Sequence, residues 1–397
     1  MTPLAPAATI VRTGLERLLS EPDPALAGRR IALLSNPASI DRGFRHAADL
    51  LFEQPHWHVV ALFGPQHGFR SDLQDNMIES PHARDTRRQV PVYSLYSETR
   101  EPTPEMLRDV DVLVVDLQDV GTRVYTYIYT MANCMRAAAR LGVRVIVCDR
   151  PNPIGGAAIE GARLRPECAS FVGQYPIPLR HGMTIGELAR LFNGEFGIGA
   201  ALDVVPLSGW RREMYHDDTG LPWVIPSPNL PTLDSAIVYP GVVLIEGTQL
   251  SEGRGTTRPF ELIGAPWIDG EQLAGALNAR GLPGVHFRPV FFEPTFQKHA
   301  TTTCGGCQLH VTDRAAFRPV RTGVEIIAEF RRQDPARFAW RQPPYEYEHE
   351  KWPIDILSGS SALRETLDAG GEVDTIVESW PGEEEAFARL REPYLLY

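Results

Sequence analysis

Lysine is almost absent from this sequence of 397 residues, in which only Lys298 and Lys351 occur. No Gly-x-x-x-x-Gly-Lys-Ser/Thr motif can therefore form, which excludes an ordinary P-loop nucleotidase. A pyridoxal phosphate enzyme needs a lysine for its Schiff base, and both lysines stand in polar segments, which disfavours that class. A Gly-x-Gly-x-x-Gly motif between a strand and a helix is also missing, so a nicotinamide enzyme is disfavoured and we expect no cofactor.

Long apolar runs and a secretory signal are missing as well. No stretch approaches the roughly 20 apolar residues that a membrane-spanning helix needs, so we expect no membrane partner. The first residues lack a basic segment followed by an unbroken apolar one, and the cytoplasm is the predicted location. Five cysteines are too few for a disulfide framework. The Cys-Gly-Gly-Cys segment at 304–307 has no second cysteine pair, so we predict reduced, structural cysteines and no metal site.

The charge balance and composition indicate a globular protein that does not bind nucleic acid. The net charge is −11, and a nucleic-acid surface would need clustered positive charge. Apolar residues make up 43% and charged residues 22%, which is normal for a protein with a large buried interior. This length suits two domains, which we place at 1–200 and 201–397. The oligomeric state is left open.

The first half alternates short apolar runs with segments of helical spacing. Nearly continuous apolar strands with helices between them are typical of a parallel sheet covered on both faces. We therefore predict an α/β fold, with a Rossmann-like, doubly wound parallel sheet in the first domain. The predicted strands are 31–36, 58–65, 92–96, 111–120, 143–152 and 202–207, and the predicted helices are 44–54, 126–142 and 183–193.

The second half predicts a smaller, mixed α/β domain that closes a cleft. Apolar runs at 237–248, 284–296 and 307–313 are interpreted as its strands. Helical patterns around 324–333 and 361–370 would pack on them.

Polar residues follow several of the predicted parallel strands. In open α/β sheets, ligands bind in the crevice beyond the carboxyl ends of the strands, so these side chains predict one binding site. His67 and His181 precede glycines in two loops, where imidazole can hydrogen-bond a ligand or act as a base. The strand-end candidates are Gln66, His67, Asp116, Asp119, Arg123, Asp149, Arg150 and Asn152.

Two further segments predict a site for a sugar. Tyr125 and Tyr127 follow the strand at 111–120 and could stack on the apolar face of a pyranose ring. The loop IEGTQLSEGRGTTRPFE at 245–261 combines glycines and threonines with Glu246, Glu252 and Arg254. So many glycines favour a backbone that closely approaches a ligand.

Long, ordered motifs resemble one bacterial enzyme family. They include DVDVLVVDLQDVGTRVYTYIYT, DRPNPIGG, SFVGQYPIPLRHGMTIGELARLFN, SPNLPTLDSAIVYPGVVLIEGTQLSEGRGTTRPFELIGAPW and the terminal YLLY. In these segments, and from about residue 30 to the end, the sequence resembles the exo-β-N-acetylmuramidase, NamZ-like family. The resemblance implies a Rossmann-like domain, a smaller C-terminal domain, and release of N-acetylmuramic acid from the non-reducing end of peptidoglycan fragments.

One position departs from the family pattern. The common segment reads Glu-His-Gly, whereas here Gln66 precedes His67. An amide cannot donate a proton as a carboxylic acid does. The downstream segment SDLQDNMIES offers Asp75 or Glu79 instead.

Glycoside cleavage generally needs one protonated and one ionised carboxyl group, and their spacing separates retention from inversion. We therefore hypothesise that Glu79 or Glu246 is the acid and Asp116 its partner, with His67 beside them. Substrate-assisted attack by the N-acetyl group stays open. The expected binding residues are Gln66, Asp119, Arg123, Tyr125, Tyr127, Asp149, Arg150, Asn152, His181, Asn229, Glu252 and Arg254.

Two alternatives stay open at this point. Gln66 is also compatible with a non-catalytic carbohydrate-binding or sensor protein. An enzyme acting on a nucleotide sugar is the other, although no phosphate-binding loop is visible in the sequence. In each case the partner would be a small molecule, an amino sugar or a muropeptide in the favoured reading.

Overall fold

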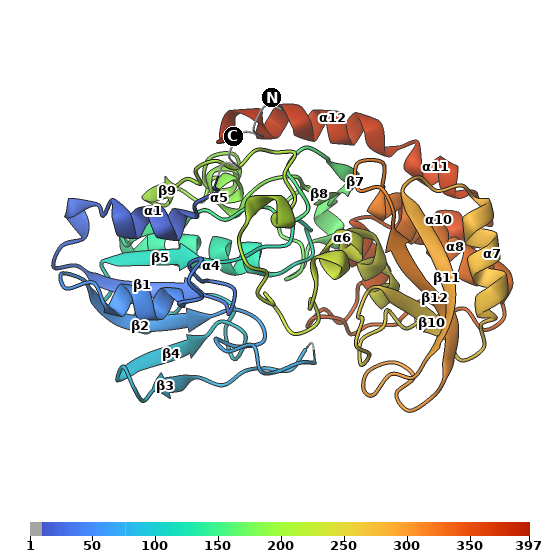
Figure 1. Cartoon of the computed structure of the whole chain (residues 1–397), viewed down its shortest axis with the longest axis horizontal. Helices are drawn as coiled ribbons and strands as arrows, with labels where there is room; N and C mark the ends of the chain where they lie inside the picture. The colour runs from blue at the N-terminus through green and yellow to red at the C-terminus, as the bar shows by residue number, and fades with distance from the viewer. Residues whose placement is uncertain (1–9, 76) are drawn as a thin grey trace, which may run out of the picture.

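The computed structural model describes residues 10–75 and 77–397, and these form a large sheet, a small sheet and a two-stranded sheet with their covering helices. The large sheet and the small sheet lie at opposite ends of the molecule, and helix α6 lies between them (Figure 1). Within the described part of the chain, no helix is both long enough and apolar enough to cross a membrane.

The large sheet has seven strands in the order β3-β4-β2-β1-β5-β6-β9. All neighbouring strands are parallel except β3, which pairs antiparallel with β4 at one edge. The chain reverses direction across the sheet between β1 and β5, which is the doubly wound order that we predicted. The strands are β1 (Arg30–Ser35), β2 (His58–Gly64), β3 (Ala83–Asp85), β4 (Val90–Ser94), β5 (Val112–Asp116), β6 (Arg144–Cys148) and β9 (Leu202–Val205).

Alternate residues of each strand face different helical layers. On β1, Ile31 and Leu33 pack with the residues of α1 and α2, while Ala32 and Leu34 pack with α4 and α5. Both faces are therefore apolar, which explains the continuous apolar runs in the sequence. The helices that cover this sheet are α1 (Gly14–Ser20), α2 (Ala47–Phe52), α3 (Pro104–Leu107), α4 (Tyr127–Leu141) and α5 (Ile185–Gly194).

The small sheet is antiparallel, in the order β10-β12-β11. The predicted strands at 284–296 and 307–313 are confirmed as β11 and β12, and Cys304 and Cys307 are buried, free thiols on β12. The predicted division at residue 200 stays a prediction, although β9, which follows it, still pairs with β6 of the large sheet. The elements are β10 (Leu262–Ala265), β11 (Val285–Phe292), β12 (Cys304–Val311), α6 (Leu233–Val242), α7 (Gly270–Ala279), α8 (Pro319–Gln333), α9 (Pro353–Ser358), α10 (Ala362–Asp368), α11 (Val373–Val377) and α12 (Trp380–Arg391).

The predicted strand at 237–248 is wrong. This run forms the end of helix α6 and the 3₁₀ turn η4 (Val243–Gly247). Every residue from Ser235 to Gly247 is buried, so the run carries no periodicity that separates a helix from a buried strand. The correction matters because η4 places Glu246 in the interior.

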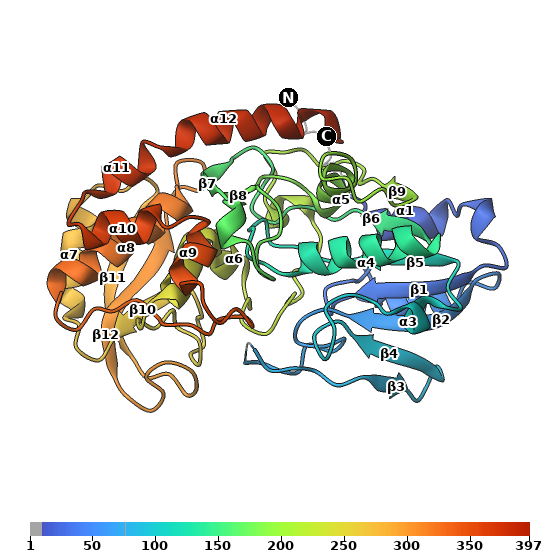
Figure 2. The same cartoon turned by 180° about the vertical axis from the view of Figure 1, so that it is seen from behind.

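A two-stranded sheet and the C-terminal helix connect the two ends of the molecule. The strands β7 (Glu160–Arg163) and β8 (Pro178–Arg180) contact α12. Helix α12 runs along one edge of the molecule, from the small sheet back toward the large one (Figures 1 and 2). The other 3₁₀ turns in the described residues are η1 (Pro24–Leu26), η2 (Pro166–Cys168), η3 (His216–Thr219) and η5 (Glu392–Tyr394).

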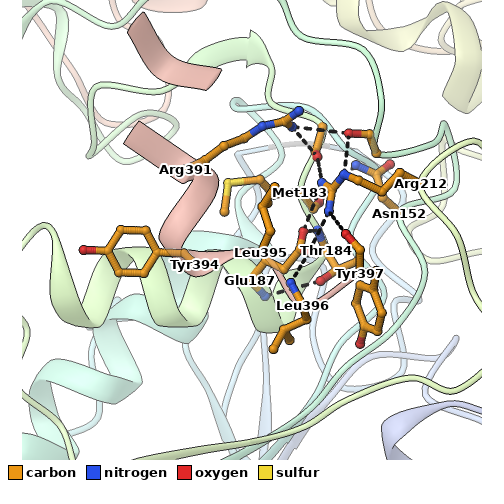
Figure 3. A network of polar contacts seen from close by, with 12 residues as sticks. Asn152, Met183, Thr184, Glu187, Arg212, Arg391, Tyr394, Leu395, Leu396 and Tyr397 are labelled. Atoms are coloured by element: carbon orange, nitrogen blue, oxygen red, sulfur yellow. Dashed lines mark hydrogen bonds and ion pairs between the residues drawn. The ribbon is translucent and has the colours of Figure 1, made fainter. Parts of the chain in front are cut away.

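The last four residues bind back to segments beside the large sheet (Figure 3). The Tyr397 hydroxyl donates to Asp149 at 2.7 Å and accepts from the backbone of Leu207 at 2.6 Å. The Leu396 amide donates to Glu187 at 2.9 Å, and Glu187 also pairs with Arg212 at 2.7 Å. The terminal segment thereby fastens α12 to the large sheet.

We expect Gly241→Ala to destabilise the packing of α6, which leads into η4, against α8. Gly241 faces Gly323 of α8, and an added Cβ would lie 1.8 Å from the carbonyl oxygen of Pro319. Relief requires α6 and α8 to separate, which should lower the free energy of unfolding by ~1–3 kcal/mol in chemical denaturation. Gly275→Ala on the exposed side of α7 is the control, because its Cβ meets no atom within 4 Å and should stabilise by ~0.5–1 kcal/mol. Equal effects of the two variants would contradict the packing argument.

Candidate active site

A pocket lies where the large sheet meets η4 and the segment before α9. The large sheet contributes residues that follow β2 and β5, and the second domain contributes η4, its following loop and residues 345 and 346. The lining residues are Gln66, His67, Val124, Tyr125, Thr126, Tyr127, Val172, Ser227, Asn229, Leu230, Tyr239, Glu246, Arg254, Phe260, Tyr345 and Glu346.

Glu246 is a buried carboxylate with a partner on each oxygen. Arg254 donates to Oε1 at 2.7 Å, and the Tyr345 hydroxyl donates to Oε2 at 2.8 Å. Burial by itself would raise the pKa of Glu246, but the charge and hydrogen bond of Arg254, the hydroxyl of Tyr345 and the charge of Lys298 outweigh it and lower the pKa. Glu246 is therefore ionised at neutral pH.

Glu346 is the second buried carboxyl group of the pocket. The Tyr96 hydroxyl donates to its Oε2 at 2.6 Å, and the Gln66 side-chain amide donates to Oε1 at 3.2 Å. Burial raises the pKa of Glu346, and the negative charge of Glu246 adds to the rise, although these two hydrogen bonds oppose it. Glu346 therefore holds its proton to higher pH than an ordinary glutamic acid.

The two carboxyl groups are suited to different tasks. A carboxyl group with a raised pKa can donate a proton near neutral pH, and an ionised one can stabilise positive charge. Their environments separate them because Arg254 bonds to Glu246, whereas Glu346 has only neutral hydrogen-bond donors. The arrangement can therefore perform acid-assisted cleavage of a polar bond.

His67 is held as a neutral imidazole at the wall of the pocket. Its Nδ1 lies 2.7 Å from the carbonyl oxygen of Leu73, which can only accept, so Nδ1 carries the proton. Burial lowers the pKa of His67 to about 4. Its backbone φ of +70° is uncommon for a non-glycine residue. His67 can hydrogen-bond a ligand through Nε2, and its predicted catalytic role stays a prediction.

The pocket brings together some of the residues predicted from the sequence. Those that line it come from both domains, which supports a shared cleft. They are Gln66, His67, Tyr125, Tyr127, Asn229, Glu246 and Arg254. Glu252 lies behind them, 3.3 Å from Arg254 and 2.9 Å from Lys298.

The structure does not bring Glu79 and Asp116 into this pocket. Asp116 is fully buried at the end of β5, where Arg150 donates to both of its oxygens at 2.6 and 2.8 Å. The Glu79 side chain is 50% exposed and lies 3.4 Å from Arg100. Asp75 is bonded to Gln297 and is also outside the lining. Among the described residues, the carboxyl groups that line this pocket are those of Glu246 and Glu346.

Five other predicted residues have structural partners instead. Arg123 is fully buried and donates to the carbonyl oxygens of three residues, and Asp149 accepts from the Tyr397 hydroxyl. Nε2 of His181 lies 3.4 Å from Oδ2 of Asp119, and the Asn152 side-chain amide donates to the carbonyl oxygen of Met183 at 3.0 Å. These side chains hydrogen-bond loop backbone groups or lie beside buried charged groups at the strand ends. A sequence pattern of polar residues after a strand does not distinguish this structural role from ligand binding.

Sequence reasoning missed Glu346, Tyr345, Tyr239 and Thr126. The segment QPPYEYEHE at 342–350 offered a signal, because aromatic and acidic residues alternate directly after two prolines. Such a segment has no strand or helix periodicity, so it was not placed beside the strand ends. Its position before α9 can be followed in Figure 2.

Comparisons with known proteins agree on one family. Residues 31–234 match the model described as exo-beta-N-acetylmuramidase NamZ, N-terminal, and residues 237–397 match its C-terminal counterpart. The chain is 49% identical over 387 residues to a protein of Bacillus subtilis (strain 168) named peptidoglycan beta-N-acetylmuramidase NamZ, covering 98% of this chain and 91% of that protein.

Two crystal structures of DUF1343 family proteins from Bacteroides fragilis NCTC 9343 have a similar fold. The first has a TM-score of 0.89 at 37% identity and covers 99% of this chain and 100% of that one. The second has a TM-score of 0.76 at 30% identity and covers 98% of this chain and 99% of that one.

We expect Gln66→Glu to destabilise the protein, and more so as the pH rises. The change replaces an N–H donor to Glu346 with a second carboxyl group at 3.2 Å, so one of the two must hold a proton in the folded state. A carboxyl group whose pKa is higher folded than unfolded makes stability fall as the pH increases. We expect a loss of ~1–3 kcal/mol in the free energy of unfolding, larger at pH 8 than at pH 5.

The matched control is Gln272→Glu, on the exposed first turn of α7. It adds the same charge in water and should change stability little at either pH. A pH-independent effect of Gln66→Glu would contradict the placement of its amide against Glu346.

Proposed function

Because the chain belongs to the exo-beta-N-acetylmuramidase NamZ family, we propose that its pocket cleaves the β-glycosidic bond of a non-reducing-end N-acetylmuramic acid, with Glu346 as the acid and Glu246 as the ionised partner. The chain is an exo-acting glycoside hydrolase, and peptidoglycan fragments are its substrates. The observation that carries the assignment is the pair of buried carboxyl groups with opposite pKa shifts in one pocket.

Glu346 donates its proton to the glycosidic oxygen as the bond to the anomeric carbon breaks. The leaving sugar departs with that proton, and positive charge develops on the anomeric carbon and ring oxygen. The ionised Glu246 stabilises this charge. Water then supplies a hydroxyl group to the anomeric carbon, and its remaining proton returns to Glu346.

The rest of the pocket supports this division of roles. Arg254 donates to Glu246, and its Nε lies 3.3 Å from Oε1 of Glu252. The positive charge of Arg254 therefore favours the ionised form of Glu246. The ring centres of Tyr125 and Tyr127 lie 4.6 Å apart, so the two rings pack on each other in the wall of the pocket. Gln66 donates to Glu346, so the absence of a carboxyl group at position 66 does not leave the pocket without an acid. This removes the observation that favoured a non-catalytic sensor.

The first test is Glu346→Gln, assayed with two substrates. With a disaccharide that carries N-acetylmuramic acid at its non-reducing end, we expect kcat to fall by roughly 10²–10⁴, the usual contribution of a positioned general acid. With β-N-acetylmuramosyl fluoride the loss should be far smaller, because fluoride leaves without protonation. Glu350→Gln, an exposed residue of the same segment, is the control. Full activity of Glu346→Gln on the disaccharide would refute the assignment.

The second test is the pH dependence of kcat/KM for the disaccharide. Activity requires Glu346 protonated and Glu246 ionised, so it should fall as the pH rises through the raised pKa of Glu346 and as it drops through the lowered pKa of Glu246. With the fluoride, whose cleavage does not need the proton of Glu346, the parent enzyme should lack the alkaline fall and keep the acidic one. An alkaline fall that persists with the fluoride would assign that limb to another group.

A further inference from the structure

Three aromatic rings surround one arginine beside Glu346. The guanidinium of Arg100 lies 4.2 Å from the ring centre of Tyr96, 4.4 Å from that of Tyr347 and 5.7 Å from that of Phe171. Arg100 is also bonded to the carbonyl oxygen of Ser97, which fixes its position between the rings. We call Tyr347, Arg100 and Phe171 the aromatic platform.

The ring of Tyr347 is exposed although it stands next to a buried carboxyl group of the pocket. Tyr347 is 44% exposed, whereas Glu346 beside it is 4% exposed. Large aromatic residues are usually covered when apolar neighbours are at hand, so an exposed ring at a pocket is a candidate contact for a ligand.

A strained turn produces this arrangement. Tyr345 and Glu348 exchange two backbone hydrogen bonds of 2.9 Å, and the two residues between them have φ values of +46° and +66°. Two successive positive φ values in a hairpin turn normally require glycine, asparagine or aspartate. Here Glu346 and Tyr347 adopt them, which directs one side chain into the pocket and leaves the next exposed. Such strain persists where the surrounding structure enforces it, and it concentrates at functional sites.

The platform is joined to the acid through Tyr96. The hydroxyl of Tyr96, whose ring packs on Arg100, donates to Glu346 at 2.6 Å. Val172, which follows Phe171, lines the pocket. The platform therefore adjoins the side of the pocket on which Glu346 stands.

A general acid must lie beside the oxygen that it protonates, so the leaving sugar lies on the acid's side of the cleaved bond. We infer that the aromatic platform is the binding site for the leaving sugar, a pyranose whose apolar face packs on Tyr347. The inference rests on the proposed function and extends it, because it assigns residues to the part of the substrate that departs. Arg100, which pairs with Glu79 at the outer edge, holds the ring of Tyr347 from one side.

The test compares a substrate that has a leaving sugar with one that has none. In Tyr347→Ala we expect kcat/KM for the disaccharide to fall by about tenfold, the equivalent of roughly 1.4 kcal/mol of binding. The value for β-N-acetylmuramosyl fluoride should stay within about twofold of the parent, because its leaving group is a single atom and a twofold change is only ~0.4 kcal/mol. Tyr347→Phe keeps the ring and should retain disaccharide cleavage.

Phe291→Ala is the control, because Phe291 is another exposed aromatic residue, 77% exposed, and does not line the pocket. It should leave both substrates unaffected. Equal losses on the disaccharide and the fluoride in Tyr347→Ala would mean that the ring only supports the turn, and no loss on either would remove it from the site. Both outcomes overturn the platform but leave the roles of Glu346 and Glu246 standing, since those depend on Glu346→Gln.

Discussion

The ion pair between Arg254 and Glu246 decides the chemistry of the pocket. Two carboxyl groups buried in one cavity cannot both ionise freely, because each charge disfavours the other. Arg254 bonds to only one of them, so the pKa of Glu246 is lowered, whereas burial and the charge of Glu246 raise the pKa of Glu346. Arg254 is itself buried, and Glu252 and Lys298 extend the pair into a chain of alternating charges. Breaking that chain would leave a buried charge without compensation.

The fold explains why this chemistry appears only where the two domains meet. The large sheet places Gln66 after β2 and Thr126 before α4, and neither residue carries a charge. The second domain contributes both carboxyl groups, through η4 and the turn before α9. The amide of Gln66 and the hydroxyl of Tyr96 reach Glu346 across this boundary. The terminal residues that follow α12 bond to Asp149 and Glu187 beside the large sheet and so hold the C-terminal part of the chain against it, and Figure 3 shows the contact with Glu187.

Much of the fold could be predicted from the sequence, because the buried parallel strands are continuous apolar runs and the helices between them are periodic. The structure of the run at 237–248 could not be predicted, because a segment that is buried on all sides has no hydrophobic periodicity that distinguishes a helix from a strand. Asp116 met every expectation for a strand-end site residue, and only the coordinates reveal that Arg150 neutralises it. Glu346 was missed because its partner Gln66 lies 280 positions earlier in the chain, and no local pattern encodes such a contact.

Gln66 illustrates how an amide in place of the family's usual glutamate can fit the proposed reaction. The Thr126 hydroxyl donates to Oε1 of Gln66 at 2.8 Å, so the amide must turn its N–H group toward Glu346. An acid becomes an anion as it delivers its proton, and an anion is stabilised by donors that are already in place. The Gln66 amide and the Tyr96 hydroxyl are such donors, whereas a carboxylate at position 66 would repel the charge that Glu346 acquires. With Glu346 as the proposed acid, an amide at position 66 supplies a hydrogen-bond donor and adds no competing charge.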